Sequence, residues 1–188
     1  MNPLRYLRGT SSNNDIGWRD ITGAIDVRGV GANDPAWTQI GSGPFYGYKF
    51  IVNDQCWFVY HIPHDIADDT VYFHSHWISN GTSTATVKWE YVYSYAKGFN
   101  QAAFNTTGTT VYSEEAASGT AYQHMVTETA GATISGLTEP DGLIIARVRR
   151  VTNGGTDNAD NIYLLTADLH YLSNSQATPG KAPNFYNA

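Results

Sequence analysis

Alternation of apolar and polar residues is the clearest pattern in this chain, and it is strongest between residues 56 and 95. Residues 56–62 are aromatic and β-branched, and they end before Pro63, which cannot donate to a β-ladder. Residues 70–78 alternate, and one face carries Val71, Phe73, Ser75 and Trp77. Residues 84–95 have one face made of Val87, Trp89, Tyr91, Tyr93 and Tyr95. The pattern therefore predicts three strands, and the stripe over residues 87–95 belongs to a sheet that buries one side.

Shorter segments with the same pattern follow one another between turns rich in Gly, Pro, Asn and Asp. Further strands are predicted over residues 18–27, 37–40, 46–53, 106–114, 120–129, 143–151 and 162–172. Asn80-Gly81 predicts a hairpin turn, and residues 96–104 suggest one short helix that is interrupted by Gly98. About eight to ten strands with little helix predict an all-β fold, an antiparallel β-sandwich of the jelly-roll type.

Two polar ends flank the predicted strands. Residues 1–17 and 173–188 contain too few apolar residues to pack a core of their own. We therefore predict an N-terminal arm (1–17), a β-sandwich domain (18–172) and a C-terminal arm (173–188). A few apolar side chains in the arms are expected to anchor them on neighbouring subunits: Leu4, Tyr6, Leu7, Phe185 and Tyr186.

Composition narrows the partners of this chain of 188 residues. The net charge of −6 argues against nucleic acid, whose phosphates require clustered Lys and Arg. No apolar run approaches the roughly 20 residues of a membrane span, and the first residues lack the apolar core of a signal peptide. A single cysteine, Cys56, excludes an intrachain disulfide. We expect a soluble protein made in a reducing cytoplasm, and the low charged fraction of 15% suggests surface that is covered in an assembly.

Histidines are the candidate residues for metal binding or catalysis. His74 and His76 lie on one face of their strand, with Cα atoms about 7 Å apart, and His61 and His64 lie nearby in sequence. Such a pair can bind a metal ion, as in cupins, but the cupin pattern expects a Glu soon afterwards, and Glu90 is too distant. The alternatives are a metal site, catalysis, or histidines that hydrogen-bond within a polar sheet face or a subunit interface. We adopt the last, and so assign no catalytic residue, metal or cofactor.

Two further groups are interpreted as structural. Cys56 lies in the middle of a strand next to Trp57, which predicts an inert buried thiol. Arg147, Arg149 and Arg150 fall on both faces of one strand. Ion pairs at a surface or interface explain these arginines better than nucleic-acid binding does.

Several segments together resemble a family of small virion proteins of tailed bacteriophages, whose members are encoded among the head and tail genes. The resemblance covers roughly residues 18–186. It rests on H-I-P-H-D (61–65), F-H-S-H-W (73–77), W-E-Y-V-Y-S-Y-A-K-G-F-N-Q (89–101), E-P-D-G-L-I-I-A-R-V-R-R (139–150), D-L-H-Y (168–171) and K-A-P-N-F-Y (181–186). It implies a structural role in the virion and carries no catalytic residue with it.

These observations lead us to expect a virion structural protein, made in the host cytoplasm, that is not an enzyme. Head decoration, which stabilises the capsid through protein–protein contacts, is the first expectation. One alternative is a tail, collar or fibre component that binds host glycans through exposed Tyr and Trp. A remoter alternative is a cupin-like metalloenzyme. The expected partners are further copies of the chain, in a homotrimer, and the major capsid protein or tail proteins.

Overall fold

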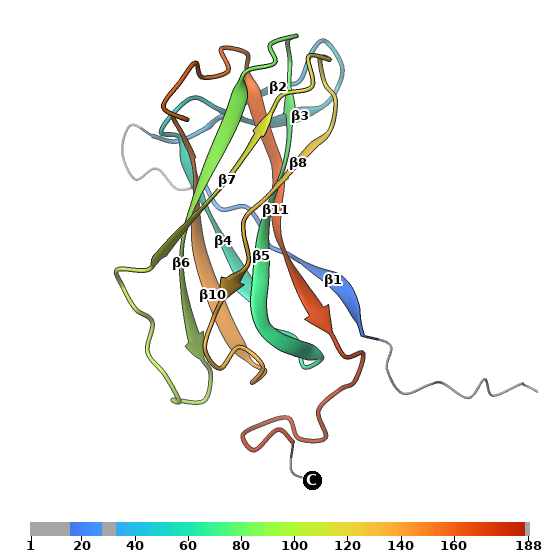
Figure 1. Cartoon of the computed structure of the whole chain (residues 1–188), viewed down its shortest axis with the longest axis vertical. Coiled ribbons are helices and arrows are strands. Elements are labelled where there is room, and N and C mark those ends of the chain that lie inside the picture. Colours follow the sequence, from blue (N-terminus) through green and yellow to red (C-terminus); the bar gives the residue numbers. More distant parts are fainter. Residues whose placement is uncertain (1–15, 28–32, 187–188) are drawn as a thin grey trace, which may run out of the picture.

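The chain folds as two antiparallel sheets packed face to face, in a computed structural model that describes residues 16–27 and 33–186 (Figure 1). Sheet A contains seven strands, namely β1 (Gly17–Thr22), β2 (Ala36–Gln39), β3 (Tyr46–Phe50), β5 (Ile66–Ser79), β8 (Met125–Glu128), β9 (Ala132–Thr133) and β11 (Ile162–Ser173). Sheet B contains β4 (Gln55–His61), β6 (Thr86–Lys97), β7 (Thr109–Ala116) and β10 (Gly142–Val151). The part of the chain that the structure describes has no helix that could cross a membrane.

The strand order is that of a jelly roll. Sheet A has the order β3-β11-β5-β8 after the edge strand β2, and sheet B has the order β4-β10-β6-β7. From β3 to β6 each strand crosses to the opposite sheet, and from β8 to β11 the main strands cross again. The two sheets therefore interleave along the sequence as in a double Greek key, which confirms the predicted fold class.

The two central strands of sheet A are each flanked by short strands placed end to end. One edge of β11 pairs with β3 along residues 162–164 and with β1 along residues 168–173. The outer edge of β5 pairs with β8 along residues 74–77 and with β9 along residues 70–71. As a result β1 lies beside the second half of β11 (Figure 1).

The core lies between the sheets and is formed by the predicted aromatic stripes. Trp77 and Trp89 are fully buried. Phe73 of sheet A packs on Tyr91 of sheet B with ring centroids 5.0 Å apart. Because both stripes point inward, the alternation seen in the sequence is the alternation of the two sheet faces.

Two local predictions were wrong. Residues 96–104 form no helix, because β6 continues to Lys97 and the chain then turns with φ of 55° at Phe99 and 62° at Asn100. Asn80-Gly81 does not close a hairpin, because β5 and β6 belong to different sheets. Gly81 is needed there for close approach, since a Cβ atom would lie 2.2 Å from the Asp160 carboxylate.

The predicted arm anchors fall in two classes. Leu4, Tyr6 and Leu7 lie outside the described residues. Phe185 is 1% exposed and packs against His64 and Phe99 of its own chain, with ring centroids 5.8 and 5.9 Å apart. Tyr186 donates its hydroxyl to the Thr138 carbonyl. The C-terminal anchors thus bind the domain itself in this structure, and a role of the arms in assembly stays a prediction.

Buried tyrosines predict a loss of stability in alkaline solution. Burial, followed by nearby carboxylates, raises the pKa of Tyr95 to about 12, and burial raises the pKa of Tyr91 further. Between the unfolded-state pKa of about 10 and these values, the folded state binds more protons, so stability falls as pH rises. We expect the melting temperature to drop across this range. Tyr91→Phe should make the drop shallower, and a melting temperature that stays constant would contradict this explanation.

Candidate outer-face site on sheet A

The outer face of sheet A gathers most of the histidines of the chain. Tyr72, His74 and His76 alternate along β5 with core residues, so their side chains point away from the core. The register places Asp168 of β11 and Glu128 of β8 on either side of His74. We name the following residues the histidine–carboxylate cluster: Asp20, His74, His76, His124, Glu128, Asp168 and His170.

Asp168 joins the two histidines of β5 at the centre of this cluster. His74 Nδ1 lies 3.6 Å from Asp168 Oδ1, and His76 Nε2 lies 3.2 Å from Asp168 Oδ2. The second nitrogen of each ring has a different partner. His74 Nε2 contacts Glu128, and His76 Nδ1 lies 2.9 Å from His124 Nε2. Both nitrogens of both imidazoles are therefore engaged.

His170 extends the cluster towards β1. Its Nε2 atom contacts Asp20, and its Nδ1 atom lies 3.3 Å from Glu128. The His170 and His74 ring centroids are 3.5 Å apart. Asp20 reaches this position because β1 pairs with β11 and places Asp20 opposite His170.

A cavity of about 420 Å³ lies beside the cluster and is lined by Trp18, Tyr72, Glu128 and His170. Trp18 and Tyr72 meet edge to face, with centroids 5.5 Å apart and an interplanar angle of 81°. Trp18 remains 58% exposed. The cavity thus has one aromatic wall and one wall with a carboxylate and an imidazole. We call it the sheet A pocket.

The structure brings together two of the four predicted histidine candidates. His74 and His76 share the outer face of sheet A, as predicted. His61 and His64 lie elsewhere and approach Asp141, at 3.3 and 3.4 Å respectively. The candidates therefore do not converge on one centre.

Several residues of the histidine–carboxylate cluster were not predicted from the sequence to belong to a site. Asp168 and His170 alternate on β11 as His74 and His76 do on β5. A spacing of two residues indicates that Asp168 and His170 lie on the same face of β11. It does not reveal that β11 pairs with β5, because the two segments are far apart in the chain.

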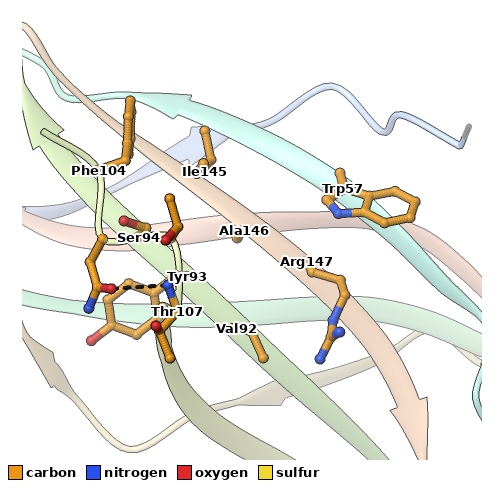
Figure 2. A pocket seen from close by; sticks show the side chains of 12 residues that line it. Trp57, Val92, Tyr93, Ser94, Phe104, Thr107, Ile145, Ala146 and Arg147 are labelled. Atoms are coloured by element: carbon orange, nitrogen blue, oxygen red, sulfur yellow. Dashed lines mark hydrogen bonds between the residues drawn. The ribbon is translucent and has the colours of Figure 1, made fainter. Parts of the chain in front are cut away.

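A second hollow lies on the outer face of sheet B. It has a volume of about 190 Å³ and lies on β6 and β10 beside the loop of residues 104–108. Figure 2 shows Phe104 and Ile145 towards one end and Trp57 and Arg147 towards the other. Arg147 is already paired with Glu90 at 2.7 Å. This hollow is also lined by Ser94, Asn105, Thr106 and Thr107, but its volume is less than half that of the sheet A pocket.

The remaining candidates are structural. Cys56 is buried, as predicted. Burial raises the pKa of its thiol far above the usual range, so the reactive thiolate does not form near neutral pH. Arg147 and Arg149 pair with Glu90, as surface ion pairs were predicted to do. Arg150 differs from that prediction, because it is buried and donates to backbone carbonyl groups.

Comparison with known proteins gives little further information. No protein-family model matches the chain, and no curated protein matches it. Among solved structures, the chain is similar to a protein described as "xylan-binding module CBM15", with 10% sequence identity and a TM-score of 0.40. The similarity covers 84% of this chain and 97% of that one. A likeness at this level assigns the chain to no family.

Proposed function

We propose that this chain is a non-enzymatic recognition protein of a tailed-phage particle and that its sheet A pocket binds a saccharide. The observation that carries the proposal is the composition of the pocket. Trp18 and Tyr72 form an aromatic wall next to Glu128 and His170. This pairing of an apolar surface with polar hydrogen-bonding groups suits a ligand that is itself apolar on one face and polar at its rim.

A pyranose ring has that character. Its C–H groups make an apolar face that packs on an aromatic ring, and Trp18 presents a large apolar surface for it. Its hydroxyl groups donate to carboxylate oxygens, and Glu128 supplies them. The volume of about 420 Å³ lies within the range of about 300–1,000 Å³ that small-molecule sites occupy. The pocket can therefore hold a small saccharide unit.

The role in the virion is proposed from the sequence resemblance. Within that role, the pocket supports the tail-, collar- or fibre-associated alternative over capsid decoration, because attachment to a capsid needs protein contacts rather than a polar–aromatic cavity. The proposed homotrimer would present the pocket three times. Repeated sites on one particle raise avidity well above the affinity of each site.

Trp18→Ala tests the proposal. The full chain is titrated calorimetrically with oligosaccharides prepared from host cell-surface polysaccharides, and one class is expected to bind. Loss of the aromatic wall should weaken binding by about tenfold or more. The matched control is Trp37→Ala. Trp37 is similarly exposed, but it lies on β2, which pairs with β3 at the opposite end of β11 from β1.

Saccharide binding by the two variants decides whether the sheet A pocket is the binding site. Loss of binding in Trp18→Ala alone supports the pocket. Loss of binding in Trp37→Ala alone, or failure of every saccharide to bind, overturns the proposal. Bound saccharide should be recovered intact, and shorter products would contradict the non-enzymatic role.

A further inference from the structure

We propose that His74, His76 and Asp168 bind a divalent transition-metal ion, for which Zn²⁺ is the best match. The three side chains come from the adjacent strands β5 and β11, and Asp168 lies directly opposite His74 in the register. One donor atom from each residue lies within 4.8 Å of the others. This inference concerns a site next to the sheet A pocket and does not depend on saccharide binding.

The distances suit a tetrahedral ion. Metal–ligand bonds of about 2.0–2.2 Å place two ligand atoms of a tetrahedral Zn²⁺ site about 3.4 Å apart. The His76 Nε2–Asp168 Oδ2 distance is 3.2 Å, and the His74 Nδ1–Asp168 Oδ1 distance is 3.6 Å. Each imidazole nitrogen thus lies at about this separation from one oxygen of Asp168, which is Oδ2 for His76 and Oδ1 for His74.

The outer contacts orient both imidazoles for metal binding. A metal-bound histidine usually donates its other ring N–H to a carboxylate or another acceptor, which fixes the tautomer. His74 Nε2 can donate to Glu128, which leaves the lone pair of Nδ1 directed towards Asp168. His76 Nδ1 can donate to His124 Nε2, which leaves the lone pair of Nε2 towards the same carboxylate.

A second observation concerns the oxygen of Asp168 that faces His74. Asp168 is 7% exposed, and its Oδ1 atom has no hydrogen-bond partner among the described residues. A buried carboxylate oxygen without a hydrogen bond is costly. An ion held between Asp168 and the two imidazoles satisfies this oxygen and balances its charge.

The ligand set selects the class of metal. Two imidazoles and one carboxylate suit Zn²⁺ and neighbouring transition metals, whereas Ca²⁺ and Mg²⁺ require oxygen ligands. A second combination, His74 with Asp20 and His170, competes for the same His74 ring. We favour the set with Asp168 because Asp168 is buried, while Asp20 is exposed.

Metal binding is tested on the full chain after treatment with a chelator. Calorimetric titration with Zn²⁺ alone should show one ion per chain. His76→Gln and Asp168→Asn should each weaken binding by about 100-fold or more. Zn²⁺ should raise the melting temperature of the unmodified chain and of the control His61→Gln, because binding to the folded state alone stabilises it.

Several results would overturn the inference: no stoichiometric Zn²⁺, affinity unchanged in His76→Gln, or equal loss in His61→Gln. His76 is partly exposed, so its variant decides the matter if Asp168→Asn does not fold. Co²⁺ in place of Zn²⁺ should give the visible absorption of a tetrahedral ion, and this absorption should be absent in His76→Gln. Trp18→Ala should keep full Zn²⁺ binding, so failure of the saccharide proposal and failure of this one are distinguishable.

Discussion

Trp89→Ala is expected to lower the free energy of unfolding by about 3–5 kcal/mol, the usual cost of removing a buried aromatic side chain. Trp89 is fully buried in sheet B and packs edge to face on Phe50 of sheet A, with centroids 5.4 Å apart. Its removal leaves a cavity between the two sheets. The backbones on both sides are held in place by hydrogen bonds between neighbouring strands. The site therefore has little freedom to collapse.

Equilibrium unfolding in guanidinium measures this effect, and two variants control it. Trp37 is 60% exposed, so Trp37→Ala should cost well under half as much. Trp89→Phe keeps most of the apolar volume and removes an indole N–H that has no hydrogen-bond partner among the described residues. It should therefore cost clearly less than Trp89→Ala. Equal losses for Trp89→Ala and Trp37→Ala would show that the stripe of β6 is not the core.

Arg150→Ala is expected to cost about 3–5 kcal/mol, because two hydrogen bonds from a charged donor are lost together. The guanidinium is buried, and it donates to the Phe50 carbonyl at 2.8 Å and to the Asn158 carbonyl at 2.5 Å. It thereby ties the end of β10 to β3 in the other sheet. Without it, both carbonyl groups remain buried and lack this donor.

Arg149→Ala is the matched control. Arg149 is partly exposed, and its partner Glu90 keeps the ion pair with Arg147, so its loss should cost about 1 kcal/mol or less. Arg150→Lys should recover only part of the stability, because one ammonium group does not reproduce the planar fork that reaches both carbonyls. Thermal unfolding of the three variants gives the comparison. Equal destabilisation by Arg149→Ala and Arg150→Ala would contradict a special role for Arg150.

The strands with one buried face were predictable because burial imposes a period of two. Residues 143–151 were predicted as a strand, and β10 runs from Gly142 to Val151. The start of β5 was missed because Asp68 and Asp69 are typical turn formers. Both carboxylates instead serve the neighbouring backbone, since Asp68 accepts from the Thr70 amide and Asp69 from the Thr138 amide.

The candidate site was predictable only along one strand. Alternation placed His74 and His76 on the same face, which the structure confirms. Alternation says nothing about which strand lies alongside, and register is set by pairing between segments far apart in sequence. Asp168 and Glu128 could therefore not be assigned to these histidines. His61 and His64 were grouped with them by nearness in sequence, yet the jelly roll carries His61 to the opposite sheet.

The placement of β1 bears on the saccharide binding that we propose for the sheet A pocket. The side chains of β1 are almost all exposed, and it is held by its ladder to β11 and by a few contacts, such as the 2.8 Å ion pair of Arg19 with Asp65. Yet β1 supplies Trp18, one wall of the pocket. If β1 were docked in half of the molecules, the apparent Kd would be about twice the intrinsic value. A second molecule that held β1 in place would thus tighten the proposed ligand binding without touching the ligand. By linkage, the ligand would strengthen the contact of that molecule with β1 equally.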